Sequence, residues 1–367
     1  MAHPRRFRFG VIHEDPQPPA RWTGHLRRIE ELGFSTFLIR DHFVPDFFGD
    51  QPAPLVSLAH AAGATSRLRL GTMVLAVDYR HPVLLAKEAA TLDVLSGGRL
   101  ELGLGAGWLR REYEGAGIVF EPAGVRIERL EETVGILEGL FAPGPFSFAG
   151  KHYTVTDLDG YPKPAQRPGP PILIGGGRRR VLTLAGRVAD IVGILTTSVA
   201  TGTVVDDPAE RLAASVEQKL AWVREGAGLR YPDIELSLIP SLVLERDRER
   251  AATELIIARG WTGVTPTDVL AMPSVFIGSL DEIAEQMEER RARYGLSYYV
   301  VSDRHLDGVA PLVARLAGRW AASPGLPEAR RSAAPGETPA RRGARCMRPA
   351  IPRNAPRTVR ETGADPS

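Results

Sequence analysis

Two adjacent polar residues, Asp41 and His42, follow a short run of β-branched and apolar residues, Thr36–Ile39, which predicts a strand. A histidine holds or releases a proton near neutral pH, so His42 is a candidate general acid or base. A structural, hydrogen-bonded histidine is the alternative. Neighbouring side chains on a strand point to opposite faces, so Asp41 and His42 share a site only if the strand ends before them. Pro45 predicts that it does, because a central strand does not continue past a proline.

A first glycine-rich segment follows another apolar run and contains Gly103, Gly105 and Gly107. This spacing resembles the nucleotide-binding loop of Rossmann enzymes and methyltransferases. Trp108, however, occupies the position of the last glycine of that motif. Such a loop also normally follows the first strand of its domain, whereas here three predicted strand–helix units come before it. The alternative is that small residues allow a flat ring or a neighbouring strand to approach the backbone closely.

A second glycine-rich segment, Gly175-Gly176-Gly177-Arg178, stands between an apolar run and a predicted helix. Free amides at a helix N-terminus and a cationic side chain together form an anion site, which predicts phosphate binding, with a mere tight turn as the alternative. Other chemistries have less support. The chain has a single cysteine, Cys346, no His-x-x-x-His pair and no Gly-x-Ser-x-Gly turn, so we expect neither a metal site nor a serine-hydrolase triad.

The candidate residues all fall just after predicted strands, and these strands alternate with helices. We expect eight strands, at Phe7–Ile12, Thr36–Ile39, Leu68–Leu75, Arg99–Leu104, Pro171–Ile174, Ile191–Leu195, within Ile234–Leu244, and at Tyr298–Val301. We expect helices at Ala20–Leu32, Leu55–Ala64, Val83–Leu95, Ile127–Leu140, Arg179–Gly186, Pro208–Glu225, Arg246–Arg259, Leu280–Tyr294 and Val309–Leu316. Eight such units predict a (β/α)8 TIM barrel, whose ligands bind at the carboxyl ends of the strands. An open doubly wound sheet also alternates, but the count of eight favours the barrel.

Two segments interrupt the alternation. Residues 143–166 read as a hairpin turned at Gly150-Lys151, and residues 260–275 read as an irregular insertion. We take both as outgrowths of one domain that covers residues 1–320. The remaining segment, 321–367, is rich in Pro, Ala and Arg and has nine arginines against four acidic residues. With few large apolar side chains to bury, this basic tail is predicted to be disordered.

The overall composition limits the class of protein. A chain of 367 residues with 43% hydrophobic content can bury a large core, and no apolar run is long enough to span a membrane. The domain before the tail is close to neutral, which does not favour nucleic-acid binding. We expect a soluble cytoplasmic homodimer that acts on a small-molecule substrate, with no nucleic-acid or membrane partner.

Several longer motifs resemble the luciferase-like monooxygenase superfamily. They are Gly33–His42, Leu70–Val74, Ser96–Trp108, Tyr161–Gly176, Gly186–Asp190 and Ile277–Gln286. The resemblance covers residues 5–318 in order, and within the superfamily the chain is most similar to the branch that uses coenzyme F420, a deazaflavin. It implies an F420-dependent oxidoreductase that transfers a hydride to or from an organic substrate. An FMN-dependent monooxygenase is the alternative, and a barrel that binds its ligand without turnover is a third possibility.

The resemblance also implies which residues contact the cofactor. It predicts a non-prolyl cis peptide at Met73-Val74 under the central ring of the cofactor, with Asp41 and His42 beside that ring. It also predicts that Ala106 and Gly107 pass the edge of the ring and that Gly175 to Gly177 meet the tail or phosphate. The implied cofactor-binding residues are Asp41, Met73, Val74, Ala106, Gly107, Gly175, Gly176, Gly177 and Arg178.

Two positions depart from the family pattern. Sugar-phosphate dehydrogenases of this group carry a catalytic glutamate where this chain has Trp108, so the resemblance does not extend to that activity. His42 therefore remains the main candidate for catalytic proton transfer. Arg40 stands at a position that is often neutral, and we expect it to influence which substrate charges are accepted.

Overall fold

A computed structural model describes residues 5–45, 48–197, 199 and 202–319, and the predicted tail lies outside these residues. The strands of the central sheet are all parallel, and β1 pairs with both β2 and β13. The sheet closes because β5 pairs with β3 and β4 on one side and with β8 on the other. Its members are β1 (Arg8–Ile12), β2 (Thr36–Ile39), β3 (Arg69–Thr72), β4 (Leu75–Ala76), β5 (Leu100–Gly105), β8 (Ile172–Gly176), β9 (Ile191–Ile194), β10 (Glu235–Leu238) and β13 (Leu296–Ser302). Since β3 and β4 are two parts of one interrupted strand, the predicted eight-stranded barrel is confirmed, and the open sheet is excluded.

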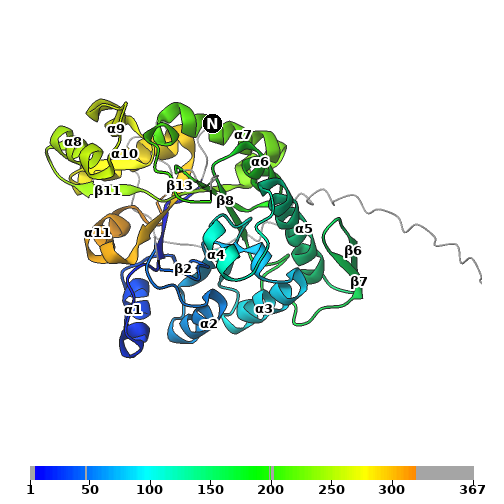
Figure 1. Cartoon of the computed structure of the whole chain (residues 1–367). Coiled ribbons are helices and arrows are strands. Elements are labelled where there is room, and N and C mark those ends of the chain that lie inside the picture. The colour runs from blue at the N-terminus through cyan, green and yellow to red at the C-terminus, as the bar shows by residue number, and fades with distance from the viewer. Residues whose placement is uncertain (1–4, 46–47, 198, 200–201, 320–367) are drawn as a thin grey trace, which may run out of the picture.

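Helices surround the barrel (Figure 1). They are α1 (Pro19–Glu31), α2 (Pro54–Ala64), α3 (Pro82–Leu95), α4 (Arg110–Gly115), α5 (Ala123–Phe141), α6 (Arg179–Val188), α7 (Ala213–Ala227), α8 (Arg248–Arg259), α9 (Pro266–Ala271), α10 (Leu280–Tyr294) and α11 (Leu306–Leu316). Short 3-10 turns are η1 (Val77–Tyr79), η2 (Pro208–Arg211), η3 (Gly228–Asp233) and η4 (Asp303–His305). The local sequence explains where some of these helices begin and end. Ser279 and Glu282 form a reciprocal capping box at the start of α10, and Gly33 after α1 has a φ of 83°.

The structure confirms the prediction in the first of the two long insertions and corrects it in the second. The hairpin is present as β6 (Phe146–Ala149) and β7 (Thr154–Leu158), and its strand β6 lies against α5. The segment predicted as irregular, residues 260–275, instead contains α9 and leads into β12 (Val275–Gly278). β12 pairs in parallel with β11 (Ser241–Leu244) outside the barrel. The single helix predicted at Pro208–Glu225 is also divided, into η2 and α7.

The barrel interior is a packed column of apolar side chains. Its fully buried members are Ile12, Leu38, Leu173, Ile191, Tyr298 and Val300. Glycines make room for them, since a Cβ on Gly71 would lie 2.7 Å from Leu38 and one on Gly10 would lie 2.9 Å from the Tyr298 hydroxyl. Met73 and Val74 pack on this column and stay partly exposed, so they form its upper end at the carboxyl ends of the strands.

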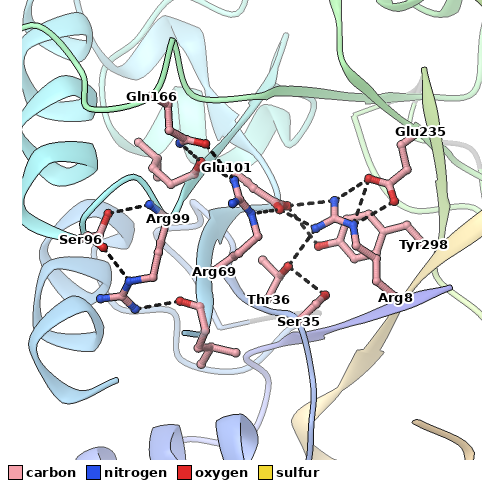
Figure 2. A network of polar contacts seen from close by, with 12 residues as sticks. Arg8, Ser35, Thr36, Arg69, Ser96, Arg99, Glu101, Gln166, Glu235 and Tyr298 are labelled. Atoms are coloured by element: carbon pink, nitrogen blue, oxygen red, sulfur yellow. Dashed lines mark hydrogen bonds and ion pairs between the residues drawn. The ribbon is translucent and has the colours of Figure 1, made fainter. Parts of the chain in front are cut away.

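The opposite end of the barrel is filled by a buried ionic layer (Figure 2). Arg8 lies 2.5 Å from Glu101 and 2.6 Å from Glu235, and Arg69 lies 2.5 Å from Glu101. Burial would raise the pKa of the Glu101 carboxyl, but the two arginines outweigh it and lower this pKa. These residues begin their strands, far from the end where barrels bind ligands, so we assign the layer a structural role.

Candidate functional site

His42 lies just beyond β2, on a segment that a buried carboxylate holds in place. β2 ends at Ile39, so the strand stops before Asp41 as predicted. His42 Nδ1 lies 2.9 Å from Glu112 Oε2, and the backbone amides of Phe43 and Val44 donate to Glu112 Oε1 at 2.6 and 3.1 Å. Glu112 is only 2% exposed and comes from α4, a helix that the sequence patterns did not reveal. One carboxylate therefore fixes both the imidazole and the chain that follows it.

The charge of Glu112 determines how the imidazole is oriented. Burial alone would raise the pKa of this carboxyl, but the hydrogen bond and charge of His42 and the two amides lower it below its ordinary value. An ionised carboxylate accepts hydrogen bonds only, so Nδ1 of His42 is the protonated nitrogen in this contact. Nε2 makes no hydrogen bond within the described part of the chain. It is therefore available to exchange a proton with a bound molecule.

Two aromatic side chains stand against the same imidazole. The Trp108 ring meets it edge to face, with centroids 5.6 Å apart, and the Phe48 ring lies 5.1 Å away. Trp108 follows β5, so the structure brings together the two sequence-predicted residues His42 and Trp108 from different strands. Both aromatic residues remain partly exposed.

The neighbouring charged residues, Arg40 and Asp41, each have a partner in the protein. Asp41 accepts from Arg80 at 2.5 and 3.1 Å and from the amide of Ala76 in β4. Arg40 pairs with Glu14 at 2.5 Å and stacks on Phe48, with its guanidinium carbon 4.0 Å from the ring centroid. Asp41 thus ties β2 to β4, and its predicted contact with the cofactor stays a prediction.

The peptide bond between Met73 and Val74 is cis, as the resemblance implied. It lies between β3 and β4, and the glycines of β5 pack against this region. A Cβ on Gly105 would lie 2.5 Å from Val74, and one on Gly103 would overlap the carbonyl of Thr72. Thr72 Oγ1 also bonds to both the carbonyl and the amide of Gly103, at 2.8 and 2.9 Å. The glycine run therefore accommodates a neighbouring strand, and since it lies in the fourth barrel strand, the methyltransferase interpretation is wrong.

Beyond β5, two adjacent strands present backbone without side chains. Gly175 in β8 pairs with Gly193 in β9, and both are partly exposed. A Cβ on Gly175 would find only one atom within 4 Å, the carbonyl oxygen of Gly193 at 3.8 Å. This leaves a flat, open surface at the carboxyl ends of the strands, which fits a planar ring.

The segment after β8 fits an anionic group. Gly176 ends the strand, Gly177 follows, and α6 begins at Arg179 without a side-chain cap. Uncapped amides at a helix N-terminus attract anions. Arg178 is more than half exposed and pairs with Glu210 at 2.9 Å. Together with the flat surface, these groups suit a ring cofactor with a phosphate-bearing tail.

A further polar cluster joins β1, α1 and β13 at the same end of the barrel. Asp303 accepts from His13 at 3.0 Å, from His25 at 3.3 Å and from the amides of Glu14 and Asp15. Burial would raise the pKa of Asp303, but these hydrogen bonds lower it to about 2. A groove of about 860 Å³ runs beside this cluster and is lined in part by Ile12, Glu14 and Asp303.

Asp303→Asn should lower the free energy of unfolding at pH 7 by about 2 kcal/mol. A carboxyl whose pKa is lowered by folding stabilises the protein above its ordinary pKa near 4, and this contribution disappears as the pH falls through about 2. Urea unfolding of both proteins at pH 7 and pH 3 measures the difference, which should shrink at pH 3. Asp307→Asn, on a side chain that is 84% exposed, is the control and should have little effect. An equal loss at both pH values would contradict this account.

Two general features accompany the site. Within the described ranges, no group of three His, Cys, Asp or Glu residues is arranged to hold a metal ion. Among the helices of those same ranges, none is long and apolar enough to cross a membrane.

Comparison with curated proteins gives two kinds of relative. The chain is 29% identical over 290 residues to the F420-dependent glucose-6-phosphate dehydrogenase of Microbacterium testaceum (strain StLB037), which covers 77% of this chain and 81% of that protein. It is 33% identical over 162 residues to the FMNH2-dependent dimethylsulfone monooxygenase of Pseudomonas putida, which covers 44% of each chain. The two relatives are named for different cofactors, so the comparison leaves the choice between them open.

Solved structures share the fold. The coenzyme F420-dependent tetrahydromethanopterin reductase from Methanopyrus kandleri aligns with a TM-score of 0.65 at 20% identity, over 85% of this chain and 99% of that chain. The oxygenating constituent of 3,6-diketocamphane monooxygenase from the CAM plasmid of Pseudomonas putida aligns with a TM-score of 0.61 at 16% identity, over 85% and 98% of the two chains. The model of the luciferase-like monooxygenase family matches residues 6–298. The chain therefore belongs to the luciferase-like monooxygenase family and is a flavin- or deazaflavin-dependent oxidoreductase.

Proposed function

We propose that this enzyme transfers a hydride between coenzyme F420 and an organic substrate, with His42 as the residue that moves the accompanying proton. The observation that carries the proposal is the His42–Glu112 contact of 2.9 Å at the carboxyl end of β2, which leaves Nε2 available. The longer match to a relative named as F420-dependent supports the choice of cofactor, because it covers 81% of that protein.

The chain contributes position and proton management to this chemistry. When bound, F420 would supply or accept the hydride. Its ring carries a carbon atom where FMN has the reactive nitrogen, so F420 is confined to hydride transfer and does not share the oxygen chemistry of FMN. Met73 and Val74 would support one face of its ring, Ala106 and Gly107 would lie along the edge of the ring, and Asp41 would hold the loop beside it. The amides of Gly175 to Gly177 and the side chain of Arg178 would hold the anionic tail. His42 gives or takes a proton at Nε2 while Glu112 stabilises the imidazolium form.

An FMN-dependent monooxygenase is the second candidate. The relative named as FMNH2-dependent is 33% identical to this chain, although over a shorter segment. Calorimetric titration of the purified protein with F420 and with FMN tests the choice. We expect F420 to bind at least about tenfold more tightly, and the reverse order would favour the monooxygenase.

Native mass spectrometry of the same sample tests the predicted homodimer.

A barrel that binds its ligand without turnover is the third possibility. Incubation with reduced F420 and a panel of ketones, with absorbance followed over time, separates it from an enzyme. We expect substrate-dependent oxidation of the cofactor. Tight cofactor binding without any absorbance change across the panel would favour the non-catalytic carrier.

Arg178→Ala should weaken cofactor binding by about 1–3 kcal/mol, because it removes a charge-assisted contact to the anionic tail. The neighbouring Arg179, which pairs with Glu225 at 2.8 Å and is 67% exposed, provides a matched control. Arg179→Ala should leave the affinity unchanged. Isothermal titration of the three proteins gives the dissociation constants, and equal values for all three would place the phosphate site elsewhere.

A further inference from the structure

We propose that the substrate presents a neutral apolar group, best an aromatic ring, to His42, and that Trp108 and Phe48 bind this group. Glu14 is then a specificity-determining residue, because it neutralises Arg40, the arginine that stacks on Phe48. The inference names the substrate class of the site and rests on the proposed function.

Two aromatic rings from two loops lie against the imidazole of His42. Trp108 and Phe48 are perpendicular to each other, with centroids 6.5 Å apart, and each also contacts the imidazole. They come from the loops after β5 and β2, so the rings converge from two strands of the barrel. Tryptophan and phenylalanine offer large apolar faces with preferred edge and face contacts to other rings. A flat apolar group is therefore the ligand that these side chains can bind without further partners.

The cation nearest to these rings is already paired. Arg40 stacks on Phe48, is 7% exposed, and lies 2.5 Å from Glu14. Glu14 keeps a side chain that is 19% exposed and lines the groove beside Asp303. An anionic substrate would have to displace this carboxylate before it could use Arg40.

The other arginines on this side are also engaged within the described chain. Arg80 pairs with Asp41 at 2.5 Å. Arg126 donates to the carbonyl of Gly107 at 2.9 Å, and both Arg126 and Arg110 stack on Phe120, at 3.9 and 4.4 Å from its centroid. A phosphate or carboxylate beside Trp108 would lose its hydration and would have to compete with these contacts for a cation, which is costly. A neutral group carries no such cost.

The presence of Trp108 instead of a glutamate also favours a neutral apolar substrate. The resemblance places a glutamate here in sugar-phosphate dehydrogenases, whose substrates are polar and charged. In this chain the position carries an indole that packs edge-on against His42. The exchange removes a polar group from the substrate side of the histidine and adds apolar area.

A matched pair of probes tests the inference by binding alone. Acetophenone and benzoate have the same size and a shared ring, but only benzoate is charged at neutral pH. We expect the wild-type protein, loaded with F420, to bind acetophenone at least about tenfold more tightly than benzoate by saturation-transfer NMR and calorimetry. Equal or tighter binding of benzoate, or no binding of acetophenone at millimolar concentration, would overturn the inference.

Two variants and one control identify the residues responsible. Trp108→Ala should weaken acetophenone binding about tenfold. Glu14→Gln should improve benzoate binding about tenfold by releasing Arg40, while acetophenone is little affected. Phe43→Ala is the control, because this ring belongs to the same loop but stacks on Tyr79 at 4.6 Å. If Trp108→Ala binds like wild type, Trp108 does not form the substrate surface.

The outcomes separate this inference from the proposed function. If the probes bind as expected but no hydride transfer to or from F420 is detected, the proposed function fails and the specificity surface stands. If F420 binds and a sugar phosphate is oxidised faster than neutral alcohols such as 1-phenylethanol, the proposed function stands and the inference is wrong.

Discussion

His42→Ala should reduce turnover at least about a hundredfold while cofactor affinity and melting temperature change little. The expected loss follows from the role of Nε2, which alone is free to exchange a proton while Nδ1 donates to Glu112 at 2.9 Å. General acid–base catalysis contributes about 10²–10⁴-fold to a rate. Turnover, F420 affinity and thermal unfolding measured on one preparation test the prediction. A purely structural histidine would instead lower the melting temperature and leave the rate per folded molecule nearly normal.

A double-mutant cycle with Glu112→Gln makes the test sharper. If Glu112 acts only by positioning His42, the Glu112→Gln substitution should slow the wild-type enzyme but have no further effect in the His42→Ala background. Additive losses would show that Glu112 acts independently. If the turnover of His42→Ala stays within a few-fold of wild type, His42 is not the catalytic residue, and Trp108 and Glu14 are the next residues to test.

Sequence patterns predicted the barrel because its strands are short apolar runs separated by amphipathic helices. The bounds of β2 and α10 agree with the prediction, and both elements have strong local signals. The signal of α10 is the capping box of Ser279 and Glu282. The parallel pair β11 and β12 had no such signal, because its pairing joins residues about 34 positions apart and depends on tertiary contacts. Six-residue helices such as α4 and α9 are too short for a periodic pattern to show.

The same distinction applies to the site. The positions of His42 and Trp108 just beyond the second and fourth barrel strands could be predicted from the sequence, while their roles stay predictions. Their partners could not. Glu112 contacts His42 across 70 positions, and Asp303 contacts His13 across 290. One signal for Glu112 was available, because it is a carboxylate shortly after β5, but its short helix α4 lacks apolar periodicity. The family resemblance predicted Asp41 beside the ring, whereas the pairing of its carboxylate with Arg80 depends on the fold.

Glu101→Ala should lower the free energy of unfolding by about 3 kcal/mol or more, without weakening cofactor binding. Glu101 is 2% exposed and is the carboxylate that Arg8 and Arg69 share at the N-terminal end of the barrel (Figure 2). Its removal leaves Arg69 without a carboxylate partner among the described residues and leaves Arg8 with Glu235 alone. An uncompensated charge in this partly buried layer is costly, whereas the site at the other end of the strands is untouched.

Urea unfolding measures the loss of stability in Glu101→Ala, and a substitution in a surface ion pair provides the reference value. Asp307→Ala removes the partner of Arg28 in an exposed ion pair of 3.0 Å, where both side chains are more than half exposed, and should cost no more than about 1 kcal/mol. Glu101→Gln keeps the volume and one acceptor but removes the charge, so its cost should lie between those of the other two variants. If Glu101→Ala unfolds as readily as Asp307→Ala, the ionic layer contributes little to stability. If it weakens F420 binding as strongly as Arg178→Ala, the two ends of the barrel are coupled, and the layer has a role beyond packing.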